Sequence, residues 1–209
     1  MSVPFEVISA DEHDRLQELY GPLTAAVRRL VDASIRTGVD GDAIRDAQAA
    51  IEAVTATLES RLHEGPRTLR HAVTGRPVAW ADPAIGLRNA LAPPLEIHHT
   101  EDGRCWTEFT LGAAYEGPPG RVHGGICALV LDHILGEAAS EGLIKPRFTG
   151  TLTLKYLRGT PLGALRAEAW IERTEGVKAF ARGQISDAEG VTVEADGIFV
   201  MPAWAREAG

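Results

Sequence analysis

Hydrophobic residues recur at helical spacing in two stretches of the first third of the chain. Within residues 11–36 and residues 42–63 they lie three or four positions apart, which is typical of an amphipathic helix. They are Leu16, Leu19, Tyr20, Leu23, Val27, Leu30, Val31 and Ile35 in the first stretch, and Ile44, Ala47, Ile51, Val54, Leu58 and Leu62 in the second. We expect an antiparallel helical hairpin that ends at Gly65-Pro66, as an N-terminal extension over residues 1–75. A hairpin this apolar on one face has to pack on the rest of the protein or on a partner.

The rest of the chain has the pattern of strands interrupted by one helix. Residues 66–94, rich in proline and glycine, predict a surface connection with Trp80 and Leu87 as anchors. Short apolar or alternating runs predict strands at 95–99, 105–111, 151–157, 166–174, 178–186 and 192–201. The one helix-length apolar segment among them is residues 122–141. A single helix within a run of antiparallel strands predicts an α+β domain over residues 76–209, in which a curved sheet wraps one central helix.

Composition and charge exclude some classes of protein. The chain has 209 residues, of which 44% are hydrophobic and 24% charged, as in ordinary globular domains. Its net charge of −8 supplies no basic face for a nucleic acid. All three lysines, Lys145, Lys155 and Lys178, lie in the second part, so a small anionic ligand would be steered there.

Cysteine usage and apolar runs suggest a cytoplasmic protein. Cys105 and Cys127 are too far apart for a CxxC metal or redox motif, so we expect both to be reduced and without a metal. The N-terminus is acidic and lacks the apolar segment of a secretory signal. The longest uncharged apolar run, residues 126–131, is too short to span a bilayer.

The segment from Gly120 to His133 carries the candidate chemistry. Gly124 and Gly125 stand at the start of the expected helix and lack a Cβ atom, so a ligand can approach the backbone closely. The first amides of a helix have no intrahelical acceptor and can stabilise an anion or an oxyanion. Asp132 is a carboxylate among aliphatic neighbours, which is costly unless it has a partner or a function.

Helix geometry separates these two groups. Eight residues divide Gly124 from Asp132, or roughly 12 Å along a helix. An attacking group has to lie within about 3–3.5 Å of the carbon that it attacks. Two antiparallel copies can combine Gly124 of one chain with Asp132 of the other, so an enzyme of this kind is at least a dimer with two equivalent sites.

The same part of the chain resembles the PaaI-type hotdog-fold acyl-CoA thioesterases. The resemblance runs from Asn89 to about Met201 and leaves residues 1–75 outside. It rests on residues 89–94 (NALAPP), on residues 115–120 (YEGPPG) leading into His123-Gly124-Gly125, on Asp132 nine residues after His123, and on residues 148–158 (FTGTLTLKYLR).

The resemblance implies a hotdog fold and hydrolysis of acyl-CoA to the free acid and CoA, without a cofactor. The Gly124 amide would polarise the thioester carbonyl, and Asp132 of the partner chain would activate water or attack directly. Thr149 would hold the water or orient Asp132, and His123 would fix the turn and add a polar contact. Some PaaI-type enzymes have Asn six residues before the His; Gly117 stands there and excludes a side-chain oxyanion donor at that position.

Further residues are assigned to the substrate on the same basis. Gly125 would lie beside the thioester, and Lys155 and Arg158 would meet the phosphates of CoA. The acyl chain would contact apolar walls from Ile126, Val130 and Tyr156. The partners are then an acyl-CoA and at least one further copy of the chain, with a dimer of dimers open, and neither nucleic acid nor membrane.

Other interpretations of these residues stay open. The domain could be a hotdog hydratase or dehydratase, or an acyl-CoA-binding module without catalysis, and the hairpin could dock a partner. Asp132 could be a structural acid at a dimer interface, and Thr149 a residue at the start of a strand.

Charged side chains near these residues also have plain structural interpretations. Lys155 and Arg158 could be solvated charges on a strand. His133 and Glu137, four residues apart, are expected to pair on the helix surface, unless Glu137 tunes the site from one turn away. The pair His98-His99 is expected at the surface.

Overall fold

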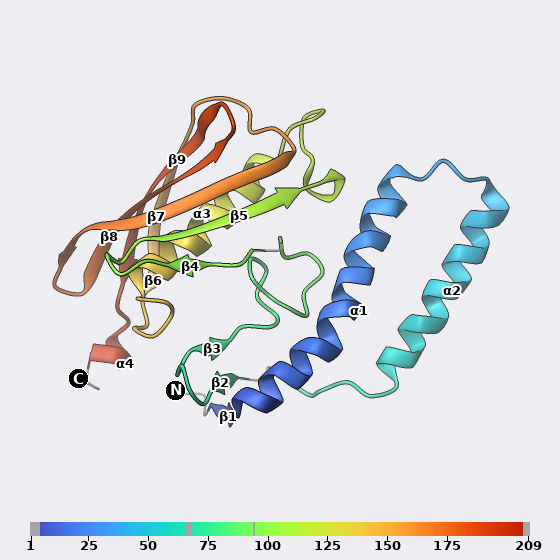
Figure 1. Ribbon diagram of the computed structural model, residues 1–209, viewed down its shortest axis with the longest axis horizontal. Coiled ribbons are helices and arrows are strands. Elements are labelled where there is room, and N and C mark those ends of the chain that lie inside the picture. Colours follow the sequence, from blue (N-terminus) through green and yellow to red (C-terminus); the bar gives the residue numbers. More distant parts are fainter. Residues whose placement is uncertain (1–4, 66–67, 94, 207–209) are drawn as a thin grey trace.

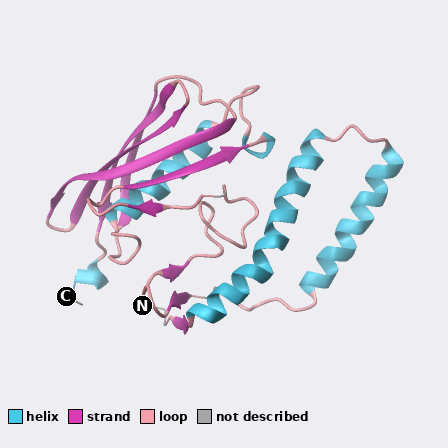
Figure 2. Cartoon of the chain, viewed as in Figure 1, coloured by secondary structure: helices cyan, strands magenta, loops and turns pink. Residues whose placement is uncertain are grey.

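A curved antiparallel sheet wraps one central helix in the computed structural model, which describes residues 5–65, 68–93 and 95–206 (Figures 1 and 2). The helix is α3 (Gly124–Ala139). The sheet has the strand order β4-β5-β7-β8-β9-β6. Its strands are β4 (His98–His99), β5 (Cys105–Leu111), β6 (Phe148–Tyr156), β7 (Gly163–Glu175), β8 (Lys178–Asp187) and β9 (Gly190–Val200). The α+β hotdog architecture expected from the sequence is confirmed.

The core lies between α3 and the inner face of the sheet. Leu131, Ile134 and Leu135 of α3 are fully buried against β7, β8 and β9. Val130 is also fully buried in this core. The prediction that Val130 lines an acyl pocket is therefore wrong, because its side chain is already used to hold the helix on the sheet.

Two strand glycines let α3 approach the sheet this closely. A Cβ atom on Gly183 would lie 2.4 Å from Leu135 and 2.8 Å from a backbone oxygen of β7, and one on Gly197 would lie 2.5 Å from Phe199. We expect Gly183→Ala to destabilise the fold by about 1–3 kcal/mol through overpacking. Gly136→Ala, inside α3 with its nearest neighbour a Phe199 ring carbon at an ordinary contact distance of 3.5 Å, should instead stabilise by about 0.5–1 kcal/mol. Denaturant titration of both variants checks the opposite signs.

The N-terminal part consists of two long helices and a small sheet. The helices are α1 (Ala10–Arg36) and α2 (Gly41–Glu59), close to the expected bounds. The strands β1 (Glu6–Ile8), β2 (Leu69–His71) and β3 (Pro77–Val78) pair with one another and were not expected from the sequence. The predicted boundary between residues 75 and 76 lies in the connection from β2 to β3, and the division into domains stays a prediction. Pro66 and Pro94 lie outside the described residues.

Of the two hairpin helices, α1 packs on the body of the protein, whereas every residue of α2 is exposed. Thr24 of α1 is buried, and the rings of His13 and Tyr20 lie beside Trp80 of the connection. The remaining short elements are the turns η1 (Ala113–Tyr115), which contacts α1, and α4 (Ala203–Arg206). Among the described residues, no helix combines the length and apolarity that crossing a membrane requires.

Candidate active site

The start of α3 presents one free backbone amide. His123 is the N-cap, and its Nδ1 atom accepts a hydrogen bond of 3.0 Å from the Gly125 amide. The amides of Ile126 and Cys127 donate to the His123 carbonyl. Within the described part of the chain, the Gly124 amide has no such acceptor, so it remains available at the positive end of the helix.

Tyr156 of β6 lies directly against this turn. Its hydroxyl donates a hydrogen bond of 2.9 Å to the Gly124 carbonyl. A Cβ atom on Gly124 would lie 3.3 Å from the phenolic oxygen, which is tighter than most side-chain contacts. The absence of a side chain at Gly124 therefore serves the close approach of Tyr156 as well as access to the amide.

Asp132 and Thr149 form the other polar pair. The Thr149 hydroxyl donates to Asp132 Oδ1 over 2.8 Å, within the same chain. Asp132 is partly exposed, and no described residue forms a hydrogen bond with its second oxygen. The bond from the threonine hydroxyl to one carboxylate oxygen holds the Asp132 side chain in one rotamer. It leaves the other carboxylate oxygen able to accept a proton.

One strand thus holds both groups, at opposite ends. β6 carries Thr149 near its start and Tyr156 at its end, and these contact Asp132 and Gly124 respectively. β6 is an edge strand with an unpaired side, and most of its residues are exposed. If β6 paired antiparallel with its own copy about the middle of the strand, Thr149 of one chain would lie close to Tyr156 of the other.

Arg158 already has a partner. It donates 2.8 Å to Asp187 Oδ2, a second bond to Oδ1, and 2.8 Å to the Gly190 carbonyl. The bond from Arg158 lowers the pKa of Asp187 to about 2. Contact between Arg158 and a CoA phosphate would compete with this pair.

Arg121 is a cation near the site that the sequence interpretation missed. With Arg158 it lines a cavity of about 440 Å³ beside the turn that leads into α3. No ion pair engages Arg121 or Lys155 among the described residues, so these two have their charges available. The sequence could have indicated Arg121, because it lies two residues before His123.

Solved structures of related proteins decide the family. The chain is 36% identical to a crystal structure of a thioesterase superfamily protein, with a TM-score of 0.78 over 87% of this chain and 94% of the other. The chain belongs to the thioesterase superfamily. A family model described as thioesterase superfamily also matches residues 119–194 of this superfamily member. The family-level resemblance found in the sequence is confirmed.

Two other relatives are more distant or cover less. The acyl-coenzyme A thioesterase THEM4 of Xenopus laevis is 35% identical over 95 residues, which are 44% of this chain and 42% of THEM4. The matched segment therefore spans less than half the length of that curated relative. Zebra fish thioesterase superfamily member 2 shares 18% identity and a TM-score of 0.50 over 59% of this chain and 91% of its own, which shows the fold alone.

α3 also carries a buried acidic residue, Glu137, one turn beyond His133. The Glu137 side chain is completely buried and accepts two bonds of 2.9 Å from Arg76. His99 Nε2 lies 3.2 Å and His133 Nε2 3.7 Å from its oxygens. The expected surface location of the His133–Glu137 pair is therefore wrong, because Glu137 is buried. The prediction that His98 and His99 lie at the surface is confirmed, since both are exposed, and His98 stacks on Trp106.

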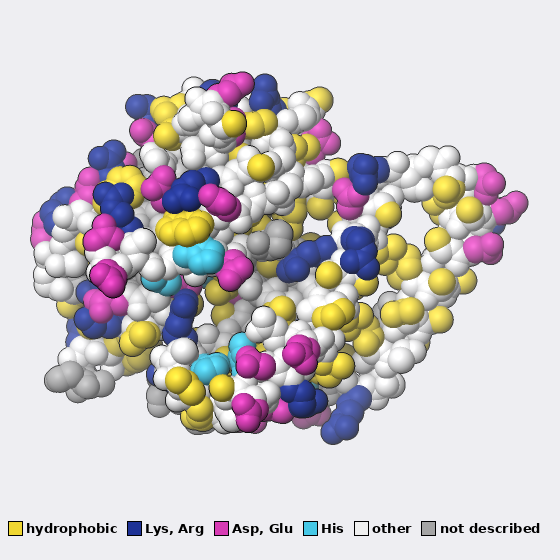
Figure 3. Space-filling model, in the orientation of Figure 1, with side chains coloured by type: hydrophobic (Ala, Val, Ile, Leu, Met, Phe, Trp, Pro, Cys, Tyr) yellow, Lys and Arg dark blue, Asp and Glu magenta, His cyan; other side chains and the backbone are white. Residues whose placement is uncertain are grey.

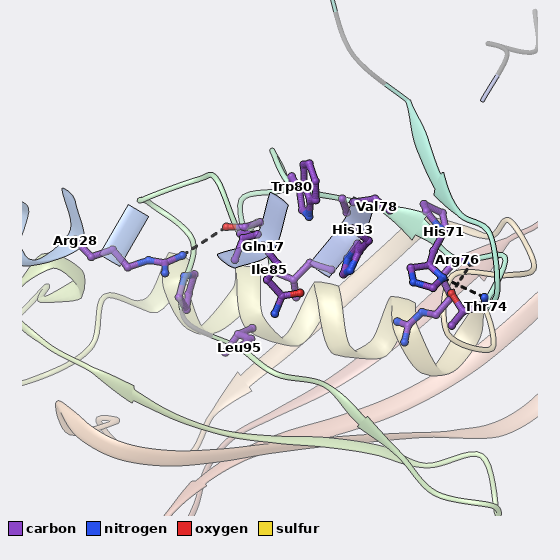
Figure 4. Close-up of a pocket in the computed structure, with 15 residues that line it drawn as sticks. His13, Gln17, Arg28, His71, Thr74, Arg76, Val78, Trp80, Ile85 and Leu95 are labelled. Carbon is purple, nitrogen blue, oxygen red and sulfur yellow. Dashed lines mark hydrogen bonds between the residues drawn. The ribbon is translucent and has the colours of Figure 1, made fainter. Parts of the chain in front are cut away.

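Arg76 reaches Glu137 from the rim of a cavity of about 510 Å³ between α1 and the connection (Figure 4). Arg76 and His71 lie near one end of this cavity, with His13 of α1 between them and Trp80, and Arg28 lies at the other end. None of the candidate catalytic residues lines it. The Glu137 cluster therefore joins α3 to the N-terminal part rather than forming part of the candidate site.

Proposed function

We propose that this protein is an acyl-CoA thioesterase, which hydrolyses the thioester to a free acid and CoA thiol. The observation that carries the proposal is that one chain holds both a helix amide without an acceptor at Gly124 and a carboxylate oriented by a hydrogen bond at Asp132. An oxyanion donor and a general base are the two groups that hydrolysis of an acyl group requires. Membership of the thioesterase superfamily supports the same reaction.

The reaction needs two chains. The Gly124 amide of one chain donates to the thioester oxygen, while Asp132 of the partner removes a proton from water. The water oxygen bonds to the carbonyl carbon, and the oxyanion is stabilised at the amide. Collapse breaks the C–S bond, and the proton held by Asp132 passes to the departing thiolate. Direct attack by Asp132 is the alternative, with water then hydrolysing the anhydride.

The homodimer is proposed to form through β6. Antiparallel pairing of two β6 strands satisfies their unpaired edges. It also places the Gly124 end of each chain beside the Asp132 end of the other, which makes two equivalent sites. Phe148, 59% exposed at the start of β6, would be covered by such pairing.

Substrate contacts follow from the charges around the helix start. Lys155 and Arg121, which have no ion-pair partner in the described part of the chain, would contact the CoA phosphates, and Arg158 would join them only by sharing its bond with Asp187. Gly125 would border the thioester, with Ile126 and Tyr156 as apolar walls. We also place the enzyme in the cytoplasm, where acyl-CoA occurs and where buried reduced thiols such as Cys105 and Cys127 persist.

The first experiment is thiol release from short, long and aromatic acyl-CoAs by wild type and Asp132→Ala. Loss of a general base should lower kcat roughly 10²–10⁴-fold. Binding of acyl-CoA without thiol release would favour a binding module, and turnover of enoyl-CoA instead would favour a hydratase. A variant as active as wild type would remove Asp132 from the mechanism.

Thr149 gives a separate prediction. Thr149→Val removes one hydrogen bond to a charged group, worth about 1.5–3 kcal/mol, so kcat should fall roughly 10–100-fold. Thr149→Ser keeps the hydroxyl and should retain most of the activity. Thiol release by the two variants, at equal oligomer mass, checks the result; a larger loss in Thr149→Ser than in Thr149→Val would mean that the methyl group matters rather than the bond.

A further inference from the structure

The hairpin leaves an open space between α1 and α2. All residues of α2 are exposed, although it is a regular helix capped by Asp40. Figure 3 shows an opening between the two helices, with hydrophobic side chains along both sides. The exposed large hydrophobic residues of this region are Leu19, Leu23, Val27, Leu30, Ile35, Val39, Ile44, Ile51, Val54, Leu58 and Leu62.

A helix in this state needs a partner. Isolated helices of this length are marginal in water, because most helical stability in proteins comes from packing of an apolar face. On α2 that face is Ile44, Ala47, Ile51, Val54 and Leu58, spaced alternately three and four residues apart. Such spacing gives a narrow seam suited to packing against other helices.

We propose that the occupant of this space is the hairpin of a second copy of this chain, so that two hairpins form a four-helix bundle. A two-fold axis presents each apolar face with an identical one, and contacts of this self-complementary kind are the commonest in homo-oligomers. The eleven exposed hydrophobic residues of each copy supply about half of the roughly 20–30 residues that each side of an interface of about 1,600 Å² uses.

The connection between the helices is long enough to admit a partner helix. Thr37 and Asp40, which flank the turn, are both in extended conformation. Four such residues can bridge up to roughly 17 Å from the end of α1 to the start of α2. Two helices that pack directly need only about 8–10 Å between their axes. The connection therefore allows the hairpin to stay open.

Charge favours this occupant. α2 carries four acidic residues and one arginine, for a net charge of −3, whereas residues 24–36 of α1 carry three arginines and one aspartate, for +2. Arg29 has no ion-pair partner among the described residues. α2 of one copy thus complements the C-terminal half of α1 in the other.

The hairpin also belongs to a shared architecture, because the solved relative covers 87% of this chain, more than residues 76–209 alone supply.

Cross-linking through α2 tests the proposal. Ile51 lies at the middle of the apolar face, where a two-fold axis brings it near its copy, and Ala49 lies on the opposite side of α2. Because Cys105 and Cys127 are buried, Ile51→Cys and Ala49→Cys each add one accessible thiol. With a short bifunctional maleimide at micromolar protein, Ile51→Cys should form covalent dimers roughly 100-fold faster, since residues held in one complex meet at millimolar effective concentration.

Hydrogen exchange supplies the second measurement. Amides of α2 should exchange slowly in wild type and Ala49→Glu, and quickly in Ile51→Glu. Equal cross-linking of the two cysteine variants, or free-peptide exchange of α2 in wild type, would overturn the proposal. Slow exchange without any link between chains would mean that the hairpin closes on itself. Neither readout uses thiol release, so the outcome is separate from that of the proposed enzyme activity.

Discussion

Two inactive variants should restore activity when they share a dimer. Asp132→Ala lacks the base, and Gly124→Pro lacks the amide, so each alone should lose at least roughly 100-fold in kcat. A mixed dimer places the intact Gly124 of one chain beside the intact Asp132 of the other. Random mixing gives half mixed dimers with one working site of two, so thiol release should return to about a quarter of the wild-type rate.

Proline is chosen at position 124 because it removes the amide without breaking the helix. Its Cβ atom would lie 3.3 Å from the Tyr156 oxygen, so Gly124→Ala, which adds the same Cβ atom and keeps the amide, is the control for crowding. The first helical position accepts proline well, since its amide has no intrahelical acceptor. His123, with φ −61° and ψ 133°, already has the extended backbone that a residue before proline prefers. Refolded mixtures of Asp132→Ala with Asp132→Asn serve as the control and should stay inactive. If Asp132→Ala and Gly124→Pro form mixed dimers but thiol release does not rise, each site takes both groups from one chain.

The sequence predicted the domain well because its signals were local. The bounds of α3 and of the strands β5 to β9 follow from apolar periodicity and from turns such as Glu175-Gly176, and they agree with the structure within a few residues. The spacing of Gly124 and Asp132 along one helix predicts that a site combining them needs two chains, and this stays a prediction. The contacts of Thr149 with Asp132 and of Tyr156 with Gly124 then come from one strand that runs along the helix.

The features that the sequence did not predict depend on contacts between segments that are distant along the chain. β1, β2 and β3 are two or three residues long, and each is held only by pairing with the others, so no periodicity marks them. Val130 and Glu137 were misplaced for a related reason. The sheet covers α3 on one side and the N-terminal connection covers it on another, so a helix surface expected to be open is buried.

Arg76→Met should be among the most destabilising single changes in the chain. It leaves the Glu137 carboxylate buried without its two hydrogen bonds from Arg76, and removal of one partner of a buried pair costs about 3–5 kcal/mol. We expect the lower end, because the Arg76 side chain is 34% exposed and solvent screens part of its charge. Denaturant unfolding at pH 7 measures the change, with Lys145→Met, which breaks an exposed pair with Glu141, expected to cost under about 1 kcal/mol.

The pH dependence of the free energy of unfolding tests whether the unpaired Glu137 carboxylate causes the loss of stability in Arg76→Met. In wild type, burial raises the pKa of Glu137. The hydrogen bond from His133 and the charge of Arg76 together outweigh this effect, so the pKa of Glu137 lies below its ordinary value of 4.5. A lowered folded-state pKa means that the pair's stabilisation is present above pH 4.5 and is lost as the pH falls through the folded value. Without Arg76, burial is less opposed and protonation of Glu137 becomes less costly. The difference between wild type and Arg76→Met should therefore shrink from pH 7 towards pH 4, and a constant difference would contradict this origin. The double variant Arg76→Met/Glu137→Met should be more stable than Arg76→Met alone, because no charge is then left buried without its partner.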